Sequence, residues 1–171
     1  MNVKGIEMSE LEQLLSGDGA AAPPEYILER LSTEEAMRSV AGAPRTIYEE
    51  LWHIAFWQQI SLDWIAGKET QYPAHADEGF PTEAQRQNES WKALCERFFR
   101  GNAQAAAAAR HTGGLEISVK CPSRPGHPVR TMTVREQLEN LAAHNAYHFG
   151  RVVLLRQMLG AWPPPSGGYS W

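Results

Sequence analysis

The chain has 171 residues, and 16 Lys and Arg stand against 20 Asp and Glu, which gives a formal net charge of -4. Hydrophobic residues make up 43% and charged residues 21%, a globular composition that argues against a disordered chain. The basic residues are scattered, so we expect no nucleic-acid partner. No stretch reaches the roughly 18 apolar residues that a membrane span requires. We predict a single domain over residues 1–171 with no membrane partner.

The two cysteines and the N-terminal residues bear on the cellular compartment. Cys95 and Cys121 are isolated in the sequence and form no C-x-x-C pair. A disulfide between them remains an alternative, but a reducing cytoplasm is the simpler interpretation. Residues 1–7 carry Glu7 where a signal peptide would carry an apolar run. The sequence therefore predicts a cytoplasmic protein.

The first forty residues predict short helices. Ser9 is a suitable N-cap for a helix over residues 9–15, which the glycines around Asp18 would stop. A second stretch over residues 25–31 follows two prolines, which suit a first helical turn. Ser32 and Glu35 form a capping box, so another short turn of helix should begin there.

A long helix is predicted from Thr46 to Ala66. Thr46 and Glu49 form a capping box, and Gly67 supplies the stop. Apolar residues occupy two nearly opposite faces of this helix, one with Ile47, Leu51, Ala55, Leu62 and Ile65, the other with His53, Trp57, Ile60 and Trp64. A helix that is apolar on two sides is buried on two sides, so it should lie between neighbouring helices, or between a neighbour and another subunit.

The second half of the chain predicts two further long helices. Residues 82–110 should form one helix, which Gly101 could kink or interrupt. The Gly- and Pro-rich residues 111–130 read as a connector, with a short strand or extended arm over 115–119. Thr133 and Glu136 form a capping box for the last helix, which Gly160 would end.

These elements together predict an all-α protein. Three long helices and a broken first one indicate a four-helix bundle. The tail after Gly160 holds three consecutive prolines and cannot be helical. It ends in Tyr169 and Trp171, which should bring it back onto the body of the bundle.

Three histidines are candidate metal ligands. His144 and His148 are four residues apart on a helix, so both imidazoles can reach one ion. His53 lies on another long helix, on the aromatic face, and bundle metal sites are built from facing helices. The alternative is a core or surface set of histidines without an ion. Asn145 replaces the glutamate of the H-E-x-x-H zinc-protease motif.

Two other residues are candidate substrate or cofactor contacts. Trp57 lies on the face of His53, where it could line a substrate cavity or simply belong to the core. Arg151 follows His148 by about one helical turn. Its guanidinium could bind an anionic substrate group, or it could be solvated or ion-paired.

Three segments carry a family resemblance. Residues 51–57, LWHIAFW, resemble the second-helix motif of the DinB/YfiT-like family, and residues 144–150, HNAYHFG, resemble its fourth-helix motif. Residues 159–163, LGAWP, resemble a frequent ending. The likeness spans roughly residues 9–165.

The resemblance implies a four-helix bundle with up-down-down-up order and a divalent metal site that falls on His53, His144 and His148. It also implies a homodimer, since members are often dimers. Some members resemble thiol-dependent S-transferases that use a low-molecular-weight thiol, and others are called metal-dependent hydrolases. Three imidazoles suit zinc, nickel, iron or copper, and we expect zinc first, with nickel or iron as alternatives.

Three functions remain open on this basis. The first is thiol transfer to a small electrophilic substrate. The second is hydrolysis by a metal-activated water, which is less favoured because Glu49 and Glu50 are expected to point away from His53. The third is a metal-binding stress protein without turnover.

Overall fold

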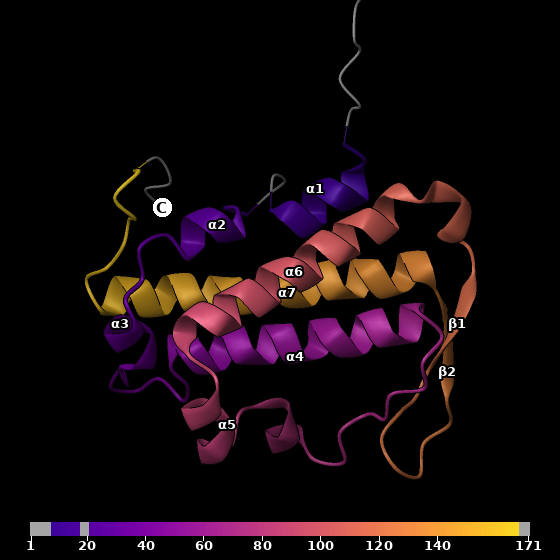
Figure 1. The fold of residues 1–171 in the computed structure, drawn as a ribbon, viewed down its shortest axis with the longest axis horizontal. Helices are drawn as coiled ribbons and strands as arrows, with labels where there is room; N and C mark the ends of the chain where they lie inside the picture. Colours follow the sequence, from indigo (N-terminus) through magenta and orange to yellow (C-terminus); the bar gives the residue numbers. More distant parts are fainter. Residues whose placement is uncertain (1–7, 18–20, 168–171) are drawn as a thin grey trace, which may run out of the picture.

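The computed structural model describes residues 8–17 and 21–167 and confirms an all-α architecture with one small hairpin (Figure 1). The expectations for residues 1–7 and for Tyr169 and Trp171 lie outside the described residues. Within the described ranges, no helix has an apolar run long enough to cross a bilayer. The single-domain boundaries, residues 1–171, stay a prediction.

The N-terminal region contains three short helices. These are α1 (Glu10–Ser16), α2 (Pro24–Ile27) and α3 (Thr33–Met37). Ser9 and Ser32 cap α1 and α3 through capping boxes with Glu12 and Glu35, as such spacing predicts. Helix α2 is shorter than the predicted 25–31, because the chain leaves helical geometry at Arg30, where φ is +50°.

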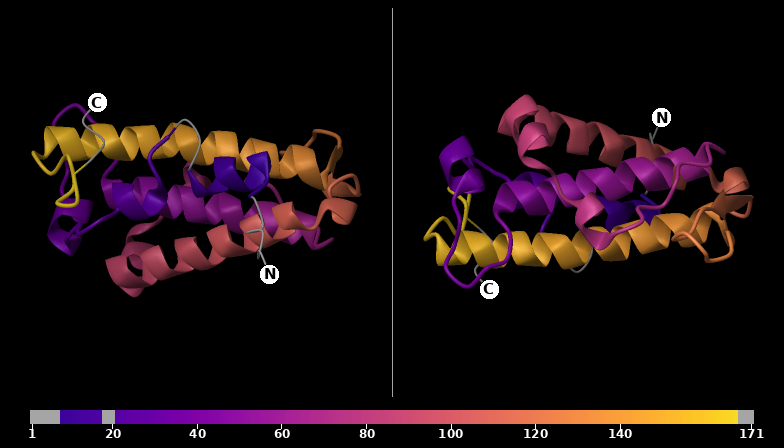
Figure 2. Two further views of the ribbon diagram at one scale, coloured as in Figure 1. Left: turned by 90° about the horizontal axis from the view of Figure 1, so that it is seen from above. Right: turned by 90° about the horizontal axis from the view of Figure 1, so that it is seen from below.

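Three long helices form the body of the bundle. Helix α4 (Ile47–Ile65) lies between α6 (Trp91–Arg110) and α7 (Val134–Met158), and α6 runs in the direction of α4 while α7 runs against it (Figures 1 and 2). Helix α1 packs over the groove between α6 and α7. The neighbours on both sides of α4 confirm the two-faced burial that its sequence predicts.

The predicted helix over residues 82–110 is two helices, which corrects its boundaries. Helix α5 (Glu83–Asn88) ends before Glu89, whose backbone is extended, and Ser90 caps α6 by accepting a hydrogen bond from the Ala93 N–H. Arg97 donates two hydrogen bonds to the Glu89 carboxylate, at 2.7 and 2.8 Å. Side-chain capping at this corner therefore outweighs the helical pattern that runs through it.

Helix α6 continues through Gly101, where the sequence allowed a kink or interruption. The buried amide of Gln58 reaches the α6 backbone here, donating to the Phe98 carbonyl at 3.1 Å and accepting from the Asn102 N–H at 3.0 Å. A Cβ at position 101 would lie 2.1 Å from the end of the Gln58 side-chain amide. Glycine is therefore needed for close approach between α4 and α6.

The connector contains an antiparallel hairpin of β1 (Ser118–Cys121) and β2 (Arg130–Thr133), in which Val119 pairs with Met132. The predicted extended arm is thus a strand, displaced toward the C-terminus. Thr133 ends β2 and caps α7 through the predicted capping box. Two short 3-10 turns, Ala76–Gly79 and Thr112–Gly114, complete the elements of the described residues.

The C-terminal tail packs back on the body as far as it is described. The rings of Trp162 and Tyr26 lie edge to face at 5.6 Å, and the Ser166 hydroxyl hydrogen-bonds the Glu29 carboxylate. The two cysteines are both free thiols. Cys121 is buried, and burial raises its pKa, while burial raises the pKa of Cys95 to about 11.

Candidate metal centre

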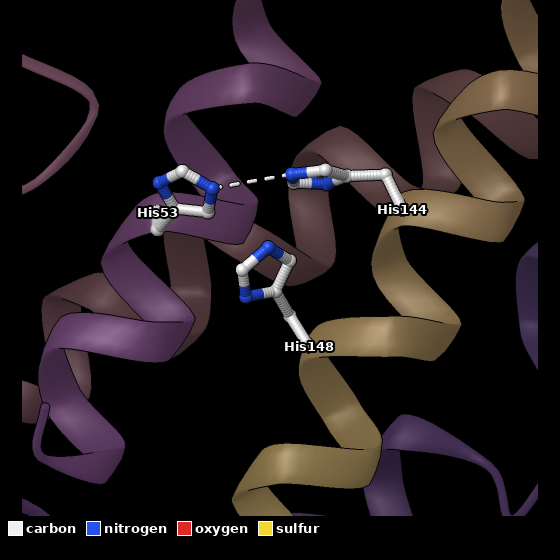
Figure 3. A group of neighbouring side chains, drawn as sticks. All are labelled: His53, His144 and His148. Carbon is white, nitrogen blue, oxygen red and sulfur yellow. Dashed lines mark hydrogen bonds between the residues drawn. The ribbon is translucent and has the colours of Figure 1, made fainter. Parts of the chain in front are cut away.

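Three imidazoles from two helices converge at the centre of the bundle. His53 comes from α4, and His144 and His148 come from successive turns of α7 (Figure 3). One nitrogen of each ring lies within 4.8 Å of the others, and the Nε2 atoms of His53 and His144 are 3.2 Å apart. The sequence spacing put His144 and His148 together, and the packing of α4 against α7 brings His53 to them.

Two of the rings have their Nδ1 atoms fixed by hydrogen bonds. His53 Nδ1 donates to the Gly79 carbonyl at 2.7 Å, and His148 Nδ1 donates to Glu50 Oε2 at 2.7 Å. Because a carbonyl or carboxylate oxygen only accepts, the tautomer of each neutral ring follows from its partner. Each Nε2 therefore carries the lone pair. That of His53 accepts a hydrogen bond from His144 Nε2 at 3.2 Å, a contact that a metal ion bound between the rings would replace.

The ring of His53 is also held by packing. Phe80 stacks on it, with ring centroids 4.3 Å apart and planes 15° apart, and the Arg45 guanidinium covers the Phe80 ring at 4.2 Å. Gly79 makes the close approach from this side, since a Cβ there would lie 3.2 Å from His53 Nδ1. The segment that follows α4 thus fixes the orientation of the His53 ring.

Glu50 corrects the expectation that this carboxylate points away from the site. It is fully buried between α4 and α7, where one oxygen accepts from His148 and the other, Oε1, lies 2.9 Å from Arg151 Nη2. Position 50 is about one turn before His53, so its side chain faces the same neighbouring helix. Arg151 supplies the opposite charge that a buried carboxylate needs.

Burial favours the neutral form of the His53 and His144 rings near pH 7. Burial lowers the pKa of His53 to about 4, against a smaller opposing effect of the Gly79 hydrogen bond. Burial also lowers the pKa of His144 to about 4, and the neighbouring His148 adds to the decrease. Only neutral imidazole has the lone pair that binds a metal. The environment therefore favours the protonation state required of a ligand.

The donor set fits a divalent cation. In a tetrahedral zinc site with imidazole nitrogens about 2.0–2.1 Å from the ion, two such nitrogens lie about 3.4 Å apart. The 3.2 Å between the Nε2 atoms of His53 and His144 is close to that value. Three protein ligands leave a tetrahedral ion one position open, which is typical of catalytic rather than structural zinc.

Two cavities open onto the histidines, the first onto all three and the second onto His53 and His148. The first, about 510 Å³, is lined by His53, Trp57, Ser61, Trp64, Tyr72, Arg130, Gln137, Asn140, Leu141, His144, Tyr147 and His148. The second, about 540 Å³, is lined by His53, Trp57, Tyr72, Pro73, Ala74, His75, Ala76, Phe80, Arg124 and His148. Both volumes lie in the range of small-molecule sites.

Trp57 and Arg151, the other predicted site residues, are differently placed. Trp57 borders both cavities, and its ring meets those of His53 and His144 edge to face, at 6.3 and 6.4 Å. Arg151 pairs with Glu50 and borders a separate surface hollow beside Arg45. Contact of either residue with a substrate or cofactor stays a prediction.

Sequence reasoning missed the residues that orient the ligands. The role of Glu50 could have been predicted from the sequence. It lies about one helical turn from His53 on a helix that is buried on two sides, and a buried carboxylate needs a hydrogen-bonding or charged partner. No local sequence pattern predicts that the Gly79 carbonyl and Phe80 contact His53, because these contacts depend on how the loop after α4 folds back on the helix.

The chain belongs to the DinB superfamily, whose family model matches residues 25–152. The matched segment contains all three histidines and α4, α6 and most of α7. No curated protein matches the chain. Superfamily membership and the histidine group agree with the resemblance seen in the sequence.

Proposed function

We propose that this protein is a metal-dependent enzyme that transfers a small thiol to an electrophilic small molecule. The observation that carries the proposal is the convergence of His53, His144 and His148 beside two cavities of molecular size. A divalent ion, with zinc the first choice and nickel or iron the alternatives, would supply a Lewis acid that favours the thiolate form of a bound thiol.

The chain's own residues would bind and orient the reactants. The indole of Trp57 and the ring of Tyr72, with centroids 4.9 Å apart, wall both cavities and limit the access of water. Gln137 donates to the Ser61 hydroxyl at 2.9 Å, and this buried pair gives the first cavity a polar floor. The first cavity thus combines aromatic walls with several polar side chains, a lining that suits a small organic electrophile with polar substituents.

Hydrolysis is the second candidate and fits the site less well. A hydrolase of this type is helped by a general base near the activated water. Among the described residues that line the two cavities, none is Asp or Glu. Glu50 is the nearest buried carboxylate, and both of its oxygens already face His148 and Arg151.

A metal-binding stress protein without turnover is the third candidate. A purely structural metal site is normally closed by a fourth protein ligand. The metal-ligating group found in the described chain has three members and borders open cavities, which supports a site that accepts a guest.

We further propose a cytoplasmic homodimer as the working form. Helix α7 exposes Leu154 and Met158, which are half accessible to solvent on this single chain. Sedimentation equilibrium of the purified protein would measure the oligomeric state, and a monomer at micromolar concentration would contradict the dimer.

The reaction is tested with the zinc-loaded protein. We would follow loss of free thiol with 1-chloro-2,4-dinitrobenzene as electrophile, for cysteine, glutathione and 2-mercaptoethanol. We expect turnover above that of metal-free protein, and loss of it in His53→Ala. A panel of nitrophenyl esters tests hydrolysis in parallel. Ester cleavage without thiol consumption would replace the first proposal by the second, and inactivity in both assays would favour the third.

A further inference from the structure

Two arginines of the connector border the cavities without an acidic partner. Arg124 lies in the hairpin loop and lines the second cavity, and Arg130 opens β2 and lines the first. Within the described residues, neither guanidinium forms an ion pair with a carboxylate. By contrast, Arg45 pairs with Asp77 and Arg135 pairs with Glu116.

A third, smaller hollow joins the two arginines. It measures about 190 Å³ and is lined by Tyr72, Ser123, Arg124, His127 and Arg130. Tyr72 borders all three cavities, so the hollow lies alongside the space that leads to the histidines. Two positive charges, an imidazole and two hydroxyl-bearing side chains therefore surround one small volume at the edge of the site.

We propose that Arg124 and Arg130 bind an anionic oxygen group, a carboxylate or phosphate, of the substrate or of the thiol. This inference rests on the proposed function only in assigning the anion to a reactant; the anion site itself is independent of the metal. A planar guanidinium presents paired N–H donors that match carboxylate and phosphate oxygens. Two uncompensated guanidinium groups also attract an anion toward the cavity by their combined field.

The position of the arginines sets which reactants would fit. Each arginine shares a cavity with at least two of the three histidines, so one molecule can reach the histidines with its reactive end and an arginine with its anionic end. The chemical class is then a small thiol or electrophile with a carboxylate or phosphate at some distance from its reacting atom. A neutral reactant would form no ion pair with these arginines, so they would not increase its affinity.

The first experiment measures the anion site without the metal. Isothermal titration calorimetry would use metal-free protein at 50 mM NaCl, with succinate and inorganic phosphate as separate probes. Variants would be Arg124→Gln, Arg130→Gln and both together. Arg100→Gln is the matched control, because Arg100 is an exposed arginine of α6 that borders none of these cavities.

We expect wild type and Arg100→Gln to bind at least one probe equally, and the double variant to bind it about tenfold more weakly or worse. The preferred probe identifies carboxylate or phosphate. No binding by wild type, unchanged binding by the double variant, or an equal loss in Arg100→Gln would overturn the proposal. Circular dichroism verifies that the variants, which change only exposed side chains, remain folded.

A second experiment links the anion site to the reaction. The cobalt-substituted protein would be titrated with 3-mercaptopropionate and with the neutral 2-mercaptoethanol, and the visible spectrum gives each affinity. We expect wild type to favour the carboxylated thiol, and the double arginine variant to lose this preference. If neither thiol changes the spectrum while succinate or phosphate binding depends on the arginines, the thiol proposal fails and the anion site stands.

Discussion

Glu50 Oε2 accepts a hydrogen bond from His148 Nδ1 at 2.7 Å, and this contact joins the first turn of α4 to α7 at a fully buried carboxylate. It fixes the tautomer of His148 so that Nε2 faces the other two histidines. A carboxylate behind a ligand imidazole also raises the basicity of the nitrogen that binds the ion. The relationship makes Glu50 a positioning residue for the proposed metal centre.

We predict that Glu50→Ala weakens zinc binding by about 10–100-fold, which is the usual effect of removing such a partner. Glu50→Gln should lose less, because the amide oxygen can still accept from His148 Nδ1. Competition with a chromogenic chelator measures both affinities. Equal zinc affinity in wild type and Glu50→Ala would show that the contact does not position the ligand.

Replacing a ligand histidine should remove the metal but not the fold. We expect His148→Ala to hold far less zinc than wild type after purification, while the far-ultraviolet circular dichroism stays helical, because the apolar core does not include the ion. His111→Gln, at an exposed loop histidine, is the control. Elemental analysis that finds equal metal in wild type and His148→Ala would refute the ligand assignment.

The metal-free protein should lose stability as the pH falls from about 6.5 toward 4. The pKa values of His53 and His144 are lowered to about 4 in the folded chain, against about 6.5 when unfolded. Between these values the unfolded chain binds more protons, so the free energy of unfolding decreases with decreasing pH. Urea midpoints at pH 7.5, 6.0 and 5.0 measure the effect.

The double variant His53→Gln/His144→Gln separates this effect from the titration of carboxylates. Its urea midpoint should depend less on pH over the same interval, since it lacks the two buried imidazoles. The same slope in wild type and the double variant would mean that other groups account for the loss.

Two helical glycines should respond in opposite ways to alanine. Gly101→Ala would drive a Cβ against the buried Gln58 amide, which is held at two backbone groups of α6, and we expect a loss of about 1–3 kcal/mol. Gly150→Ala on α7 meets nothing within 4 Å and should stabilise by about 0.5–1 kcal/mol. Chemical denaturation compares the two, and equal effects would contradict the close approach at Gly101.

The local sequence determined where the helices α4 and α7 begin and placed two of the three histidines of the candidate site together. Capping boxes such as Thr46 with Glu49 and Thr133 with Glu136 satisfy backbone donors within three residues, so the starts of α4 and α7 are encoded where they occur. The pairing of His144 with His148 is equally local, because helical geometry alone puts residues four apart on one face.

Tertiary structure decided what surrounds those histidines. It brings His53 to His144 across the interface of α4 and α7, and it buries Glu50 against His148 and Arg151. It also places the Gly79 carbonyl on the His53 ring. Each of these contacts joins segments that are separated in the chain. The arginines of the hairpin reach the cavities for the same reason. Such contacts depend on how α4, α7 and the connecting loops pack, and no periodicity within one segment specifies the partner across the interface.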